Sequence, residues 1–157
     1  MSETHGVAGR DALLARSGIE FLQGILAGEL PAPPMAGHMG LRLIEAEKGR
    51  VVFEGTPTEN HLNPMGVTHG GWFGTILDSA LGCVVMSMLP QGSFYTTLEY
   101  KVNLIRAIAP GRQMRAIATA GQSGRSTGVA TAELVGVEDG RLYGQGSTTC
   151  LVMRGAD

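Results

Sequence analysis

The stretch that decides the fold is HGGWFGTILDSALGCVVMSM at residues 69–88. Its length and apolar composition predict a helix over about 70–88 that is buried on most of its surface. Asp78 is the only charged residue in the 29 positions from 70 to 98. A carboxylate on an apolar helix costs free energy unless it is paired or takes part in chemistry, so Asp78 is the first candidate for a catalytic group.

The start of this helix is a second candidate site. Gly70 and Gly71 follow His69 directly, and the first turn of a helix leaves backbone N–H groups without intrahelical acceptors. Such N–H groups bind anions, and they stabilise the oxyanion that forms when a carbonyl is attacked. The segment therefore combines a candidate base or nucleophile with a candidate oxyanion hole, which points to hydrolysis of an acyl compound.

The spacing of these two parts predicts a dimer. Gly70 and Asp78 are eight residues apart, which is about 12 Å along a helix. Attack on a carbonyl requires contact at about 3 Å, so Asp78 cannot attack a carbonyl held at its own helix N-terminus. Two antiparallel central helices from two chains would bring Asp78 of one chain near Gly70 of the other. We therefore expect a homodimer with two active sites at its interface.

The rest of the chain predicts one sheet around this helix. An N-terminal helix is expected over about 12–28, and a polar loop over 59–68 leads into the central helix. Strands are expected at 41–46, 51–56, 95–105, 113–120, 127–137 and 142–153. We expect an α+β fold of the hotdog type, in which a curved antiparallel sheet wraps around one long helix. The helical arm would occupy 1–34 and the main domain 35–157.

The composition is that of a single domain of modest charge. The chain has 157 residues, a formal net charge of −2 and a pI of about 6.1, which gives no indication of binding to nucleic acid or to an anionic membrane. We interpret Cys83 and Cys150 as buried free thiols, which are typical of a protein in the reducing cytoplasm, while a disulfide between them stays open at the level of sequence. His61 and His69 share no ligand spacing with a carboxylate or a thiol, so we expect no metal site.

One motif gives a family resemblance. The sequence NPMGVTHGG at residues 63–71, followed by Asp78 nine positions after His69, closely resembles the PaaI-like acyl-CoA thioesterases of the hotdog-fold superfamily. The stretch 97–106 resembles the strand that follows in that family, and the resemblance extends over roughly 35–153. It implies hydrolysis of an acyl-CoA, with coenzyme A as part of the substrate and no separate cofactor. It also implies assembly as homodimers, often as dimers of dimers.

The resemblance also implies roles for particular residues. The acidic group of the family matches Asp78, its polarising amide matches Asn63, and its oxyanion N–H matches Gly70. The hydroxyl that holds the attacking water matches Thr97, or Thr96 if the strand register slips by one residue. Whether Asp78 acts as a general base on water or as a nucleophile stays open at the level of sequence.

Further residues are expected beside the substrate. His69 and Gly71 adjoin the proposed oxyanion hole, and His69 could equally orient the loop or cap the helix. The resemblance suggests that Arg125 and Ser126 lie near the nucleotide of coenzyme A. The helix face that carries Trp72 either lines an acyl tunnel or belongs to the core. In a tunnel, Trp72 would favour an aromatic or medium-length acyl group.

Two alternatives to a thioesterase remain from the sequence. A hotdog protein could bind acyl-CoA without catalysis, as a sensor or scaffold, although binding alone does not need a buried carboxylate. A hotdog enoyl-CoA hydratase would use a pair formed by histidine and a carboxylate, for which His69 is available. The motif around His69 differs from the hydratase pattern, so we predict an acyl-CoA thioesterase.

Overall fold

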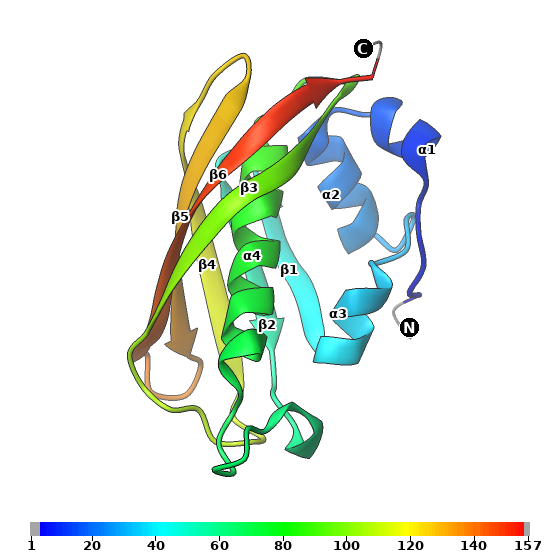
Figure 1. Ribbon diagram of the computed structural model, residues 1–157. Coiled ribbons are helices and arrows are strands. Elements are labelled where there is room, and N and C mark those ends of the chain that lie inside the picture. The colour runs from blue at the N-terminus through cyan, green and yellow to red at the C-terminus, as the bar shows by residue number, and fades with distance from the viewer. Residues whose placement is uncertain (1–3, 156–157) are drawn as a thin grey trace.

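The computed structural model describes residues 4–155 and has one long helix inside a curved sheet (Figure 1). The helix is α4 (Gly70–Met86). The strands are β1 (Leu41–Glu47), β2 (Arg50–Gly55), β3 (Ser93–Leu104), β4 (Met114–Ser123), β5 (Thr127–Gly136) and β6 (Leu142–Arg154). They pair antiparallel in the order β1-β2-β4-β5-β6-β3, so β1 and β3 form the two edges. The predicted hotdog fold is confirmed.

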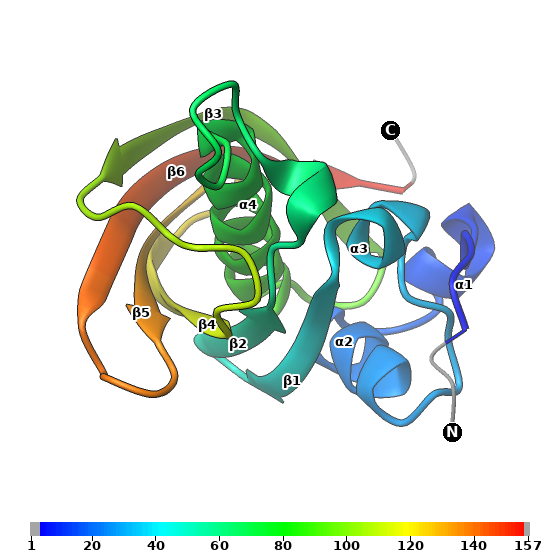
Figure 2. The same ribbon diagram turned by 90° about the horizontal axis from the view of Figure 1, so that it is seen from below.

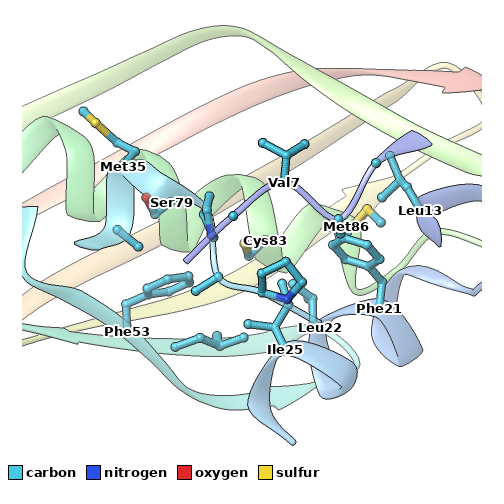
Figure 3. Close-up of a pocket in the computed structure, with 18 of the residues that line it drawn as sticks. Val7, Leu13, Phe21, Leu22, Ile25, Met35, Phe53, Ser79, Cys83 and Met86 are labelled. Atoms are coloured by element: carbon cyan, nitrogen blue, oxygen red, sulfur yellow. The ribbon is translucent and has the colours of Figure 1, made fainter. Parts of the chain in front are cut away.

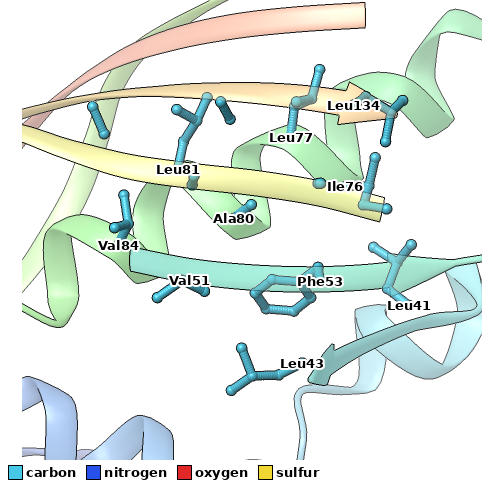
Figure 4. Packing of buried hydrophobic residues seen from close by; sticks show 14 of the residues in the cluster. Leu41, Leu43, Val51, Phe53, Ile76, Leu77, Ala80, Leu81, Val84 and Leu134 are labelled. Carbon is cyan, nitrogen blue, oxygen red and sulfur yellow. The ribbon is translucent and has the colours of Figure 1, made fainter. Parts of the chain in front are cut away.

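The core lies between α4 and the concave face of the sheet (Figure 4). Five consecutive inward positions of the helix are fully buried: Ile76, Leu77, Ala80, Leu81 and Val84. They pack in one cluster with Val51 and Phe53 of β2 and Leu134 of β5. Full burial of one such aliphatic or aromatic side chain contributes about 1.5–3 kcal/mol. This packing explains why the helix is apolar around most of its circumference.

The open side of α4 is covered by the N-terminal arm, residues 4–39 (Figure 2). It contains α1 (Arg10–Leu14), α2 (Gly18–Leu26) and α3 (Pro34–Met39). The helices α2 and α3 pack on β1, whereas α1 lies against β3. The arm therefore bridges the two edges of the sheet. None of the described helices is long and apolar enough to cross a membrane.

The expectation of one helix over 12–28 is wrong, because a capping box divides it. The Ser17 hydroxyl donates to the Glu20 carboxylate at 2.6 Å, and the Ser17 N–H donates to the same carboxylate at 2.9 Å. These bonds start a new helix at Gly18. The α3 helix was also not predicted, and the expected boundary at residue 34 coincides with its first residue. The loop before α4 contains a short 3-10 helix, η1 (Glu59–His61).

Three glycines let β3 lie close to α4. They recur with Asp78 at every fourth position on the helix face toward β3: Gly70, Gly74, Asp78 and Gly82. A Cβ on Gly82 would lie 2.3 Å from the Tyr95 hydroxyl, and one on Gly74 would lie 3.2 Å from the Tyr100 hydroxyl. Glycine within a helix costs about 1 kcal/mol relative to alanine. We call Gly70, Gly74 and Gly82 the glycine stripe, since the close approach of β3 accounts for all three.

We predict that Gly82→Ala destabilises the protein by about 1–3 kcal/mol, because the new methyl group overpacks the contact with Tyr95. Helix propensity alone predicts the opposite sign, a gain of about 1 kcal/mol. Urea unfolding followed by circular dichroism measures the difference. Combining Gly82→Ala with Tyr95→Phe should recover part of the loss, since it removes the atom that the methyl group meets first. A stabilised Gly82→Ala variant would contradict the close-approach argument.

Candidate active site

Asp78 lies half-buried in the middle of α4 and faces β3. The Thr97 hydroxyl donates a hydrogen bond to Asp78 Oδ1 at 3.2 Å, whereas Thr96 is exposed. The hydroxyl beside the carboxylate therefore belongs to Thr97. Burial raises the pKa of Asp78 above its usual value, and the hydrogen bond from Thr97 partly offsets this. A carboxylate more basic than usual suits a general base or a nucleophile.

The N-terminus of α4 presents the Gly70 N–H group. His69 is the N-cap, and its Nδ1 accepts a hydrogen bond from the Gly71 N–H at 2.8 Å. The Gly71 N–H is thereby used within the helix start. The Gly70 N–H has no acceptor among residues 4–155. Of the two glycines, Gly70 is thus the one whose N–H remains available to a ligand, and His69 caps the turn that presents it.

Asn63 is fixed by the loop that leads into α4. Its Oδ1 accepts hydrogen bonds from the N–H groups of Met65 at 2.9 Å and Val67 at 3.3 Å. The His69 N–H donates to the carbonyl of His61 at 2.8 Å, which closes the same loop. The side-chain N–H₂ of Asn63 has no acceptor within the part of the chain that the structure describes. This arrangement leaves a rigidly held amide donor close in sequence to the start of α4.

A cavity of about 600 Å³ opens beside Asp78 (Figure 3). Its floor is the face of α4 that carries Asp78, Ser79, Cys83 and Met86. Leu43 of β1, Phe53 of β2 and Tyr95 of β3 form its sides, and the N-terminal arm closes it. The volume is typical of sites for small ligands, and the lining is predominantly apolar. The sequence analysis missed this cavity, although the helical spacing from Asp78 to Cys83 and Met86 could have indicated its floor.

Trp72 does not line this cavity. The residue is 1% exposed, and its indole N–H donates to the carbonyl of Met39 at 2.9 Å. Phe73, Ile76 and Leu77 are buried as well. Of the two interpretations offered for this helix face, the structure therefore places it in the core.

Cys83 lies near the carboxylate but is a poor nucleophile. Burial, with a smaller contribution from Asp78, raises the pKa of its thiol to about 12. The thiol thus stays protonated at neutral pH. Cys83 and Cys150 are both free thiols. Within residues 4–155, no three side chains of the metal-binding types gather in one place.

Arg125 and Ser126 do not line the cavity beside Asp78. They line a second pocket of about 320 Å³ with Arg10, Phe94 and Arg154. The guanidinium of Arg10 stacks on the Phe94 ring at 5.0 Å. One protomer therefore brings Thr97 to Asp78, but it does not bring Arg125 or Ser126 there. Gly70 and Asp78 lie on one continuous helix, so the separation of about 12 Å derived from their spacing holds.

The chain matches a family model. The model of the Thioesterase superfamily covers residues 65–143, which is half of the 157 residues and includes α4, β3, β4 and β5. No curated protein matches the chain significantly in sequence.

Several solved structures are similar to the whole fold. A phenylacetic acid degradation-related protein from Ralstonia eutropha JMP134 is 28% identical, with a TM-score of 0.75 over 83% of this chain and 98% of its own. A hypothetical thioesterase protein from Streptococcus pneumoniae TIGR4, crystallised with coenzyme A, is 25% identical. Its TM-score is 0.66 over 73% of this chain and 86% of its own. The E. coli PaaI protein shares the fold at 19% identity, with a TM-score of 0.76 over 89% and 96%.

We predict that Asp78→Asn is more stable than the wild type at neutral pH. Below the unfolded pKa, about 3.9, both states hold the proton and ionisation costs nothing. As the pH rises through the raised folded pKa, the native state must ionise a half-buried group, and stability falls. The free energy of unfolding of Asp78→Asn should therefore exceed that of the wild type by an amount that grows from acid to neutral pH. Urea unfolding at several pH values measures it. Asp11→Asn, at an exposed carboxylate, is the control, and a difference independent of pH would contradict the argument.

Proposed function

Because this chain belongs to the Thioesterase superfamily and is a thioester hydrolase, we propose that it hydrolyses aromatic or medium-chain acyl-CoA to the free acid and coenzyme A. The observation that carries this proposal is the position of Asp78 on the floor of an apolar cavity, beside the Thr97 hydroxyl. The relative crystallised with coenzyme A supports this class of substrate. The reaction needs no cofactor besides the coenzyme A that the substrate carries.

In the proposed mechanism the thioester carbonyl accepts a hydrogen bond from the Gly70 N–H. Negative charge develops on that oxygen as the carbonyl is attacked, and the positive end of the α4 dipole stabilises it. The Asn63 amide supplies a second donor. The Thr97 hydroxyl holds one oxygen of Asp78, which leaves the other oxygen free for the reaction.

Asp78 can act by either of two routes. As a general base, it takes a proton from water while the hydroxide adds to the carbonyl carbon. The tetrahedral intermediate then expels the thiolate of coenzyme A, which recovers the proton from Asp78. As a nucleophile, Asp78 displaces the thiolate and forms a mixed anhydride, which water then hydrolyses.

We propose that the site is completed by a second protomer that pairs along β3. This strand is a sheet edge of 12 residues, and exposed edges pair readily with another chain. Leu98, Tyr100, Leu104 and Ile105 are 44–57% exposed along this edge. A cluster of exposed apolar side chains on a free strand edge supports burial in a dimer.

The positions along β3 also support this pairing. Gly70 packs against Leu104, whereas Asp78 is bonded to Thr97. If two β3 edges pair antiparallel about a two-fold axis near Lys101, Thr97 of one strand lies opposite the partner's Leu104. Asp78 then approaches the partner's Gly70. The proposed dimer is consistent with further assembly into a dimer of dimers.

Two further assignments rest on chemistry alone. We propose that Arg125 and Ser126 contact the phosphates of coenzyme A bound mainly by another protomer. The three guanidinium groups around their pocket support this, because guanidinium binds phosphate by paired hydrogen bonds. The two free thiols support a location in the reducing cytoplasm.

We predict that Asp78→Asn lowers the rate of thiol release from acyl-CoA by about 10²–10⁴-fold. The measurement follows free coenzyme A with a thiol reagent, for a panel of aromatic and straight-chain acyl-CoAs. Asp11→Asn removes an exposed carboxylate instead and should leave the rate unchanged. A wild type that binds acyl-CoA but releases no thiol from any member would favour a sensor, and hydration of enoyl-CoA would favour a hydratase.

We predict that two inactive variants restore activity when they share a dimer. Gly70→Pro removes the proposed oxyanion donor at the first helical position, where proline is tolerated. After denaturation and refolding of a 1:1 mixture with Asp78→Asn, half of the dimers should be mixed, each with one intact site. The activity should reach about a quarter of the wild-type value.

The control for this test is Gly70→Ala, which keeps the N–H group. Gly70→Ala should retain most of the activity alone, because the methyl group meets only the end of the Leu104 side chain. A mixture that stays as inactive as its parents, with mixed dimers demonstrated by mass spectrometry, would place Gly70 and Asp78 in separate functions.

A further inference from the structure

The cavity beside Asp78 is built largely by the N-terminal arm. Most of its lining residues come from the arm, including Leu13, Phe21, Leu22, Ile25, Pro31 and Met35. Resting on the proposed thioesterase activity, we propose that this cavity holds the acyl group and that Phe21 and Ile25 of α2 set the longest acyl chain that fits. The arm would then determine specificity and would be more than a cover for the fold.

The cavity extends away from Asp78 along α4, as the binding of an acyl chain requires. Its floor runs along α4 from Asp78 to Met86, eight residues or about 12 Å. Phe21 lies beside Met86 at the end away from Ser79 (Figure 3). An extended chain advances about 1.1 Å per bond, since an extended residue of three bonds spans about 3.3 Å. The cavity thus accommodates about ten bonds beyond the carboxylate, which corresponds to a medium-chain acyl group.

The lining favours the acyl group over the pantetheine arm of coenzyme A. Pantetheine carries two amides, and an amide buried without hydrogen-bond partners costs several kcal/mol. Among the described lining residues, the side chains that can hydrogen-bond are Arg10, Asp78, Ser79, Cys83 and Tyr95. At the α2 end of the cavity, Phe21, Ile25 and Met86 present apolar walls. An apolar acyl chain fits there without leaving a buried polar group unpaired.

The wall that α2 forms is held in place by independent contacts. The capping box of Ser17 and Glu20 fixes its start. Gly18 approaches the end of α4 so closely that a Cβ would lie 1.7 Å from the carbonyl oxygen of Met86. Leu22, on the same helix, is 2% exposed. A fixed wall can exclude acyl chains by length, because an overlong chain cannot displace it without breaking these contacts.

The test measures kcat/KM for saturated acyl-CoAs from butyryl to dodecanoyl. Phe21→Ala opens the far end, so the ratio of dodecanoyl to hexanoyl activity should rise at least tenfold. Ile25→Phe fills the cavity, so the same ratio should fall at least tenfold. Leu26→Ala is the matched control on α2, since Leu26 is exposed and lies outside the cavity lining. The ratio of dodecanoyl to hexanoyl activity of Leu26→Ala should equal that of the wild type.

The outcomes separate this inference from the proposed activity. If Asp78-dependent hydrolysis is present but Phe21→Ala and Ile25→Phe change all chain lengths equally, the arm does not select the acyl group, and the thioesterase stands. If the wild type hydrolyses none of the series or the aromatic panel, both proposals fall. If Phe21→Ala does not fold, Ile25→Phe decides alone. A shift toward shorter chains supports the inference, and an unchanged ratio overturns it.

Discussion

The close approach of β3 to α4 is the constraint on which the rest of the structure depends. The glycine stripe permits this approach, because a Cβ at Gly82 would collide with the Tyr95 side chain and a Cβ at Gly74 would lie 3.2 Å from the Tyr100 hydroxyl. Asp78 occupies the one position of this face that carries a side chain, and its carboxylate meets Thr97 there. β3, a strand of 12 residues, is also an edge of the sheet and pairs with β6 alone among the strands of residues 4–155. A helix without these glycines would hold β3 further away and separate Thr97 from Asp78.

The sequence predicted the elements whose signals are local. The buried helix and the strands follow from apolar periodicity, and the motif around Asn63 and Asp78 identified the family. The register of β3 could not be predicted, because a bulge after Thr97 interrupts its pairing with β6. Tyr95 and Thr97 face the helix before the bulge, whereas Tyr100 contacts it afterwards. Strict alternation therefore assigns one half of the strand to the wrong face.

The arm shows why local rules can also mislead. Apolar spacing over residues 12–28 is compatible with one helix, yet the Ser17 capping box starts a second one. Capping chemistry competes with helix continuation within a few residues, and here it is reinforced by the tight packing of Gly18 on the end of α4. No local sequence pattern in the arm indicates the cavity. Its walls come from segments that are distant in sequence and meet only after the arm has crossed from β1 to β3.

The burial of Asp78 links the stability of the fold to its chemistry. A carboxylate in this position raises the free energy of the native state once it ionises, because burial is the largest influence on its pKa. The same burial makes the ionised group more basic and therefore better able to take a proton from water. The hydrogen bond from Thr97 lowers the free-energy cost of ionising Asp78 but leaves its negative charge in place. A hydrophobic residue at position 78 would give a larger free energy of unfolding. The proposed chemistry therefore gives a physical reason for the carboxylate in an otherwise apolar helix.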